Sequence, residues 1–274
     1  MSQTSSPRIA FIGGGNMASA IIGGLIGNGL PASQITVVEP FEAARDALKA
    51  KFGIDALPTA SAALAGHDLV VWATKPQTFK DAAAATAAHT AHALHLSVAA
   101  GIPTDSIAQW LGTGRIVRAM PNTPALVGKG MTGLFARAEV DAAGQALVER
   151  VIGTTGQLVW VDAEDKLDAV TALSGSGPAY VFLFLEAMTQ AGVDMGLTAE
   201  QSYQLAIATF QGASELAARS DEPAATLRER VTSKGGTTYS AITHMQQAEL
   251  PQHFIAALRK AEARAKELAA EFGK

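Results

Sequence analysis

The sequence of 274 residues contains no cysteine. Disulfide bridges, zinc sites with thiolate ligands and cysteine nucleophiles are therefore excluded, and we expect a reducing, cytoplasmic setting. Basic residues are also few, because 21 lysines and arginines stand against 25 aspartates and glutamates, and the formal net charge is −4. Nucleic acids and anionic membranes bind basic surfaces, so we expect neither as a partner.

Long apolar runs without a break are lacking as well. Residues 1–18 combine a polar tail with a short apolar run that ends in glycines, which predicts a buried strand and not a signal peptide. The uncharged residues 169–185 contain Ser-Gly-Ser-Gly-Pro at 174–178, whereas a membrane helix needs roughly 20 apolar residues without such a break. With 48% hydrophobic and 17% charged residues, the composition indicates a soluble globular protein.

Short β-rich runs alternate with helical patterns up to about residue 161. Strands are predicted at residues 9–12, 35–38, 69–72, 94–98, 116–118, 131–136 and 158–161. Such alternation predicts parallel pairing with right-handed crossovers. Beyond residue 161 only helical patterns remain, at 167–173, 179–191, 199–219, 224–231 and from 251 onwards. We therefore predict an α/β domain over residues 1–162 and an all-α domain over residues 163–274.

The first predicted strand leads into Gly13-Gly14-Gly15 and then into a helix. Gly13 permits the tight turn, Gly15 lets the backbone approach a pyrophosphate, and Ala18 lets the helix pack close to the strand. The N–H groups that open the helix, together with its dipole, attract an anion. The pattern predicts a Rossmann-type, doubly wound, mostly parallel sheet that binds a dinucleotide; a glycine-rich turn without a ligand is the alternative.

The end of the second predicted strand carries an acidic residue, Glu39. A carboxylate there usually accepts hydrogen bonds from the ribose 2′-hydroxyl of NAD and repels the 2′-phosphate of NADP. The alternative is that Glu39 is merely a solvated strand end. Arg45 lies one turn into the next helix, and its direction is open at this point.

Three more loops follow predicted strands, at residues 73–77, 99–103 and 119–124. Each loop holds a proline, the middle one begins with the small residues Ala99, Ala100 and Gly101, and the last is a rigid turn that presents Asn122. Ordinary turn chemistry could explain any one of them. Because ligands bind beyond the carboxyl ends of parallel strands, all three at one edge predict a lined cleft.

Two motifs suggest a second phosphate loop and a metal site, but their positions favour other interpretations. Residues 174–178 resemble a second phosphate loop, but no strand precedes them and no Lys-Ser/Thr follows, so a helix break is predicted. His89, His92 and His95 are spaced by three, but they run from a helix into a strand and should diverge. We predict no metal site.

Six blocks of the sequence together resemble pyrroline-5-carboxylate reductase, the enzyme of the last step of proline synthesis. These blocks cover residues 11–18, 74–77, 97–102, 120–125, 168–180 and 227–238. The last two are the most specific, and the resemblance extends over nearly the whole chain.

The resemblance implies a cofactor site, a substrate site and an oligomer. With Glu39 added from its spacing, the cofactor site for NADPH or NADH comprises Gly13, Gly15, Asn16, Met17, Glu39, Ala73, Thr74, Lys75, Pro76, Ala99, Ala100, Gly101 and Asn122. The implied site for 1-pyrroline-5-carboxylate comprises Glu164, Ser233, Gly235, Gly236, Thr237 and Thr238. The helical domain is implied to form interlocked dimers, and rings of such dimers, often decamers, occur in the family.

Two features depart from the family pattern. Many members prefer NADPH, which Glu39 argues against assuming here. Some members carry proline at the position of Lys234. The choice between NADPH and NADH therefore stays open at this point.

The expected chemistry is reduction of a cyclic imine that bears a carboxylate. The loop at 233–238 opens a helix, so its free N–H groups can hold the carboxylate, and Gly235 and Gly236 allow close approach. We expect Thr238 to be catalytic by hydrogen-bonding the ring nitrogen, and no general acid is evident. Two alternatives are a hydroxyacid dehydrogenase, which would need a catalytic Lys or His in the helical domain, and a non-catalytic dinucleotide sensor.

Overall fold

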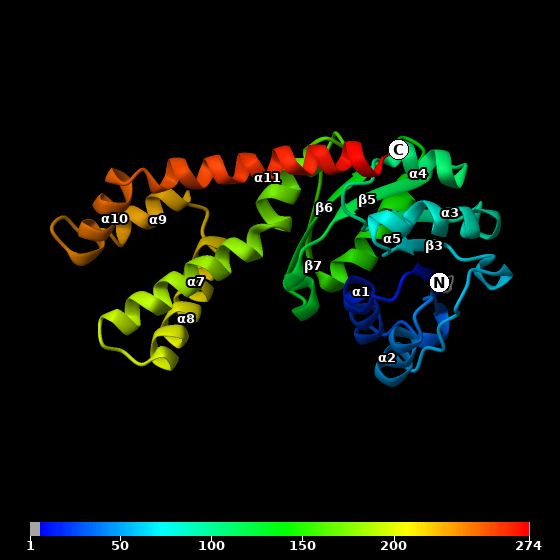
Figure 1. The fold of residues 1–274 in the computed structure, drawn as a ribbon, viewed down its shortest axis with the longest axis horizontal. Helices are drawn as coiled ribbons and strands as arrows, with labels where there is room; N and C mark the ends of the chain where they lie inside the picture. Colours follow the sequence, from blue (N-terminus) through cyan, green and yellow to red (C-terminus); the bar gives the residue numbers. More distant parts are fainter. Residues whose placement is uncertain (1–5, 274) are drawn as a thin grey trace. The chain divides into compact units, whose positions relative to one another are not determined.

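The computed structural model describes residues 6–273, and seven strands of this part form one sheet in the order β2-β1-β3-β4-β5-β6-β7 (Figure 1). The strands are β1 (Ile9–Ile12), β2 (Ile35–Val38), β3 (Leu69–Trp72), β4 (Leu94–Ser97), β5 (Ile116–Met120), β6 (Gly130–Ala136) and β7 (Gly156–Trp160). Strands β1 to β5 are mutually parallel, β6 is antiparallel to β5, and β7 is parallel to β6. The carboxyl ends of β1 to β5 therefore meet at one edge of the sheet.

Helices α1 to α5 cover the two faces of this sheet, and further helices follow β7 in the chain. They are α1 (Asn16–Gly27), α2 (Glu42–Phe52), α3 (Pro76–Thr90), α4 (Thr104–Leu111), α5 (Ala142–Ile152), α6 (Lys166–Val170), α7 (Gly177–Asp194), α8 (Ala199–Ala218), α9 (Ala224–Arg230), α10 (Thr237–Gln247) and α11 (Leu250–Phe272). A turn of π-helix at Thr171–Gly175 follows α6 directly. This turn overlaps the start of the helix break predicted at residues 174–178.

The alternation of side chains along each strand builds two hydrophobic cores. In β1, Ile9 and Phe11 face the core under α1 and α5, whereas Ala10 and Ile12 face the core under α3 and α4. All four residues of β1 are at most 3% exposed. A strand buried on both faces is typical of a parallel sheet covered by helices, which is the predicted class.

The chain forms two compact units, and these differ from the predicted division after residue 162. The sheet unit comprises the described residues up to 176 together with 261–273, and the helical unit comprises residues 177–260. Residues 163–176 join the sheet because Leu167 and Val170 pack against Gly133 of β6. The end of α11 joins it because Phe272 packs into the core under α3 and α4.

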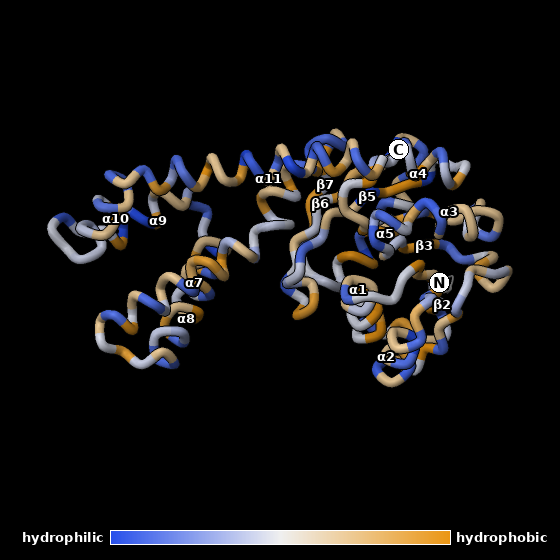
Figure 2. The backbone as a smooth tube through the Cα atoms, in the orientation of Figure 1, coloured by the Kyte–Doolittle hydropathy of each residue, from blue (hydrophilic) through white to orange (hydrophobic). Residues whose placement is uncertain are grey.

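The helical unit is built around the pair α7 and α8. Gly192 of α7 lets α8 come close, since a side chain there would lie 2.4 Å from the hydroxyl oxygen of Ser202. Tyr180 and Phe184 of α7 make ring contacts with Phe254 of α11, at centroid distances of 5.7 and 5.9 Å. Figure 2 shows hydrophobic residues along α7 and α8. Within residues 6–273, no helix is long and apolar enough to cross a membrane.

Candidate active site

The glycine loop between β1 and α1 has the geometry of a phosphate cradle. Gly13 has a φ of +96°, and a side chain there would lie 2.6 Å from the carbonyl oxygen of Ala73. A side chain at Gly15 would meet open space, and no described side chain caps the amino end of α1. The first N–H groups of α1, at Asn16 and Met17, are therefore left for an anion such as a pyrophosphate. These residues fit a dinucleotide.

Glu39 is not a solvated strand end. Its side chain lies against the glycine loop and is 6% exposed. One carboxylate oxygen accepts a hydrogen bond from the N–H of Gly14 at 2.8 Å, and the other accepts one from the N–H of Phe41 at 2.9 Å. Arg45 turns back toward the same place, because its Nη1 donates to the carbonyl oxygens of Pro40 (2.7 Å) and Glu39 (3.1 Å). An anion and a cation therefore stand together at the carboxyl end of β2.

The loop after β3 lies beside the glycine loop. The N–H of Ala73 donates to the carbonyl oxygen of Ile12 at 2.8 Å, and Pro76 occupies the first turn of α3 as predicted. The hydroxyl oxygen of Thr74 is buried without a hydrogen-bond partner among the described residues, and Lys75 is exposed. This loop can therefore offer a hydroxyl and an ammonium group to a ligand at the same edge.

The loop after β4 divides its residues between the ligand edge and the core. Ala99 is buried and Ala100 is exposed. Gly101 has a φ of +74°, and a side chain there would lie 3.3 Å from Leu268 and from Phe272 of α11. Glycine at 101 is thus required for the turn and for the packing of α11, while Ala100 is the residue open to a ligand.

Asn122, in the loop after β5, has both ends of its amide engaged. Its oxygen accepts a hydrogen bond from the N–H of Met131 at 2.9 Å. Its nitrogen donates to the carbonyl oxygen of Ser174 at 3.1 Å, within the turn of π-helix. Asn122 therefore joins the start of β6 to the segment that leads into α7, a link that nothing in the sequence signalled.

Glu164 lies in a network inside the sheet unit. Its carboxylate accepts hydrogen bonds from the N–H of Thr104 (2.8 Å), from the hydroxyl of Thr104 (2.5 Å) and from Nη1 of Arg118 (2.9 Å). Glu164 thereby caps α4 from outside and neutralises Arg118, which is 6% exposed. Nearby Asp168 is also buried, and burial raises the pKa of its carboxyl while Arg118 partly opposes the shift.

The predicted substrate loop lies in the helical unit. The N–H of Gly236 donates to the carbonyl oxygen of Ser233 at 3.0 Å, Gly235 has a φ of +78°, and α10 begins at Thr237 without a described side-chain cap. A cavity of about 390 Å³ opens here, lined by Gly235, Gly236, Tyr239, Ser240, Thr243, His244 and Gln247. Thr238 is half-buried in the first turn. Sequence reasoning missed the lining residues of α10, although their spacing by four along a helix was a usable signal.

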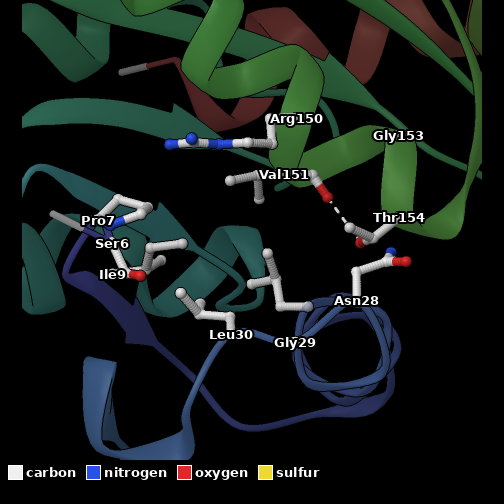
Figure 3. Close-up of a pocket in the computed structure, with 11 residues that line it drawn as sticks. Ser6, Pro7, Ile9, Asn28, Gly29, Leu30, Arg150, Val151, Gly153 and Thr154 are labelled. Carbon is white, nitrogen blue, oxygen red and sulfur yellow. Dashed lines mark hydrogen bonds between the residues drawn. The ribbon is translucent and has the colours of Figure 1, made fainter. Parts of the chain in front are cut away.

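Another cavity, of about 330 Å³, lies at the amino end of β1 (Figure 3). It is bordered by Pro7, Leu30 and Thr154, and Arg150 is the one charged side chain among the residues drawn. The predicted cofactor loops are at the other end of β1. This cavity therefore belongs to neither predicted site.

The three spaced histidines diverge as predicted. His89 lies in α3, His92 follows it at the surface, and His95 is buried in β4. Nδ1 of His95 accepts a hydrogen bond from Nε1 of Trp72 at 3.0 Å, and burial lowers the pKa of His95 to about 4. Among residues 6–273, no group of three or more acidic or histidine side chains is placed to hold a metal ion.

Comparisons with known proteins agree with this geometry. Residues 164–268 match a family model described as pyrroline-5-carboxylate reductase dimerisation, and residues 8–101 match one described as NADP oxidoreductase coenzyme F420-dependent. A pyrroline-5-carboxylate reductase from Pseudomonas aeruginosa is 44% identical over 271 residues, which cover 98% of this chain and 99% of the relative. A counterpart from Glycine max is 35% identical over 265 residues, 96% of each protein.

Solved structures of pyrroline-5-carboxylate reductases are also similar to this chain. A pyrroline-5-carboxylate reductase from Coxiella burnetii is 40% identical, with a TM-score of 0.91 over 97% of this chain and 99% of that chain. A Plasmodium falciparum pyrroline carboxylate reductase with NADP bound is 25% identical, with a TM-score of 0.85 over 96% and 98% of the two chains. The predicted fold class and resemblance are confirmed. The chain belongs to the pyrroline-5-carboxylate reductase family.

Proposed function

We propose that the protein reduces 1-pyrroline-5-carboxylate to L-proline with NADPH or NADH. The observation that carries the proposal is the glycine loop, whose positive φ at Gly13, open space at Gly15 and uncapped helix fit a dinucleotide. The relatives that cover nearly the whole chain are named for this activity. NADPH or NADH held by these residues would supply the hydride for the carbon of the C=N bond, and the nitrogen would gain a proton.

The cofactor is held by residues of the sheet unit. We propose that it contacts Gly13, Gly15, Asn16, Met17, Glu39, Ala73, Thr74, Lys75, Pro76, Ala99, Ala100, Gly101 and Asn122. Gly15, Asn16 and Ala100 are exposed, which supports direct contact. The side chain of Asn122 is engaged within the protein, so its proposed part is to hold the loop in place.

The substrate carboxylate is held by the loop at the start of α10. We propose that Ser233, Gly235, Gly236 and Thr237 bind it, and that the hydroxyl of Thr238 hydrogen-bonds the ring nitrogen. Uncapped N–H groups at a helix start favour an anion, and the adjoining cavity gives it room. An imine needs chiefly to be positioned and its charge stabilised, which such a loop can do.

Glu164 is proposed to contribute to the substrate site as well. Three hydrogen bonds already hold its carboxylate in place. We propose that it acts from this fixed position, in which Nη1 of Arg118 lies 2.9 Å from its carboxylate.

The family match supports self-association through the helical region. We propose a dimer in which residues 163–274 serve as the substrate-binding and dimerisation domain, with larger rings such as decamers built from dimers. Large apolar side chains of the helical unit are exposed and would be covered by a second copy; they include Phe182 (58%), Leu183 (62%), Tyr203 (53%) and Leu205 (57%). We place the enzyme in the cytoplasm because it has no cysteine.

A direct assay tests the activity. The purified full chain is mixed with 1-pyrroline-5-carboxylate and either NADPH or NADH, and loss of nicotinamide absorbance and formation of proline are followed together. We expect turnover with at least one cofactor. Cofactor binding without turnover would instead support a sensor, and turnover of a 2-oxo acid but not of the imine would support a hydroxyacid dehydrogenase.

A further inference from the structure

We propose that the end of α11 positions the loop after β4, and through this loop the nicotinamide half of the cofactor. The end of α11 is defined here as residues 268–273, and the loop is residues 99–103. Residues 268–273 lie outside the proposed cofactor and substrate sites, so their part is to position the loop and not to touch the reacting atoms. This inference rests on the proposed function, because it concerns the dinucleotide bound in the proposed cofactor site.

The order of the strands decides which half of a dinucleotide lies over this loop. Strand β1, whose glycine loop is proposed to hold the pyrophosphate, has β2 on one side and β3 followed by β4 on the other. In a Rossmann-type sheet the adenosine ribose lies at the end of the second strand. A dinucleotide bound across β1 therefore extends its nicotinamide half over the ends of β3 and β4. The exposed Ala100 lies in the loop that follows β4.

The end of α11 packs against this loop at two points. A side chain at Gly101, which has a φ of +74°, would lie 3.3 Å from Cβ of Leu268 and 3.3 Å from Cδ2 of Phe272. A side chain at Gly273 would lie 3.0 Å from Cδ of Pro103. Both contacts involve the second half of the loop, so a movement of α11 here would move the backbone that the cofactor is proposed to meet.

Two further interactions hold the end of α11 in this place. The hydroxyl of Ser106 donates a hydrogen bond to the carbonyl oxygen of Gly273 at 2.6 Å, and Ser106 is 8% exposed. Phe272 packs against the core under α3 and α4. Ser106 lies in the first turn of α4, which begins directly after the loop, and Figure 1 shows the red end of α11 beside this helix. The end of α11 is therefore tied to the helix that continues the loop.

Hydride transfer depends on the position of this loop. Holding two reactants in a reactive geometry supplies much of the rate of an enzyme reaction, and a misplacement of about 1 Å can cost on the order of a hundredfold. Ala99, Ala100 and Gly101 have no long side chain that could adjust to a shifted ligand. The precision of the loop therefore depends on the elements packed around it, and the end of α11 is one of them.

Variants that each remove one anchor of the full chain test this inference. The affinities of NADPH and NADH are compared with those of ADP and its 2′-phosphate, which carry the adenosine half without the nicotinamide, and kcat is measured with 1-pyrroline-5-carboxylate. Phe272→Ala should weaken dinucleotide binding about fivefold and lower kcat about tenfold, while affinity for the adenosine fragments should stay within about twofold of the wild type.

Two milder variants grade the effect. Ser106→Ala should act in the same direction but about threefold, because only one hydrogen bond to Gly273 is lost. Phe272→Leu keeps most of the apolar contact and should restore most of the kcat that Phe272→Ala loses. A purely structural role would instead change the affinities of both halves of the dinucleotide together.

Trp110→Ala is the matched control. Trp110 is a partly buried aromatic residue of the same core, near the opposite end of α4 from the loop, and its ring lies 5.8 Å from that of Phe79. Its loss should lower the thermal midpoint as Phe272→Ala does, but should leave kcat and the ratio of dinucleotide to ADP affinity unchanged. All variants are measured at a temperature where thermal unfolding shows them to be folded.

The outcomes separate the inference from the proposed function. A wild type that neither binds a dinucleotide nor reduces the imine overturns the proposed function, and the inference with it. An active wild type with unchanged kcat and affinity ratio in Phe272→Ala overturns the inference alone, as does an equal effect of Trp110→Ala. If Phe272→Ala does not fold, Ser106→Ala carries the test, and an unchanged kcat in that variant overturns the inference.

Discussion

The two proposed binding loops solve the same problem, holding an anion, in different ways. The glycine loop at 13–15 is fixed by its own chain, because the carboxylate of Glu39 accepts a hydrogen bond from the N–H of Gly14 and the carbonyl oxygen of Val38 accepts one from the N–H of Gly13. The loop at 233–238 has one internal turn bond, from Gly236 to Ser233, and no described side-chain cap. The glycine loop is thus held in shape without a ligand. The loop at 233–238 has N–H groups that are free to bind one.

This difference predicts that variants of the two loops change different measured properties. A change in the sheet unit that disturbs the long-range contacts of its loops should alter stability and binding together. A change in the substrate loop should alter catalysis with little effect on stability. The following predictions test that contrast, from the largest expected effect to the smallest.

The largest effect is expected from Glu164→Ala. The variant leaves Arg118, whose side chain is 7% exposed, without its partner and removes the cap from Thr104. Losing one partner of a buried ion pair should lower the free energy of unfolding by about 3 kcal/mol, which chemical denaturation measures. A loss below about 0.5 kcal/mol, the range of an ordinary surface substitution, would contradict the structural part of this network.

The same variant tests the proposed second part of Glu164. The KM for 1-pyrroline-5-carboxylate is measured at a temperature where the variant is fully folded. We expect it to rise. A KM equal to that of the wild type would remove Glu164 from the substrate site and leave it as a cap on α4.

Gly13→Ala should nearly abolish cofactor binding. The added carbon would lie 2.6 Å from the carbonyl of Ala73 and would need a φ of +96°. We expect NADPH and NADH affinity to fall about a hundredfold, together with a loss of stability of about 2 kcal/mol. Gly15→Ala is the matched comparison, since open space surrounds that position. It should weaken binding but keep the thermal midpoint, and equal destabilisation by both variants would contradict this account.

Lowering the pH should destabilise the sheet unit through His95. Its folded pKa of about 4 lies below the unfolded value of 6.5, so the folded state resists protonation. The stability that neutral His95 contributes is lost as pH falls below 6.5, and the loss levels off near pH 4. Between pH 7 and pH 5 it should amount to about 2 kcal/mol.

The variant His95→Gln isolates that effect. Its side-chain oxygen can still accept the hydrogen bond from Trp72, but it does not titrate. We expect the unfolding free energy to depend less steeply on pH between 7 and 5 than in the wild type. Identical slopes for the two proteins would show that other groups cause the pH dependence.

The parts of the fold that were predicted from sequence depend on residues close together in the chain. The turn at Gly13 and Gly15 and the acidic end of β2 are local patterns, and parallel pairing then brings their loops to one edge. The bonds from Asn122 to Ser174 and from Glu164 to Thr104 join residues more than fifty positions apart. No local pattern signals such pairs, because tertiary packing creates them.

The compact units divide the chain at other residues than the predicted boundary for the same reason. The helical pattern after residue 161 is correct, but periodicity does not tell what a helix packs against. Leu167 packs against Gly133 of β6. Phe272 packs in the core of the sheet unit, although the helical unit precedes it in the chain. The apolar spacing along α11, which includes Phe254, Leu268 and Phe272, therefore serves both units of one chain in turn.

The smallest effect is expected from Thr238→Ala, and it tests the other side of the contrast. The residue is half-buried in the first turn of α10, and no described hydrogen bond of the fold uses its hydroxyl. Removing that hydroxyl should lower kcat/KM about tenfold through loss of one hydrogen bond to the ring nitrogen, with the thermal midpoint and NAD(P)H affinity unchanged. Thr238→Ser keeps a hydroxyl at nearly the same position and should restore most of the activity, whereas Thr237→Ala should leave the nitrogen contact in place. If Thr238→Ser is as slow as Thr238→Ala, the side chain of Thr238 acts through packing of its methyl group and not through a hydrogen bond. The substrate loop would then not keep this group for its ligand, and it would differ less from the glycine loop than we propose.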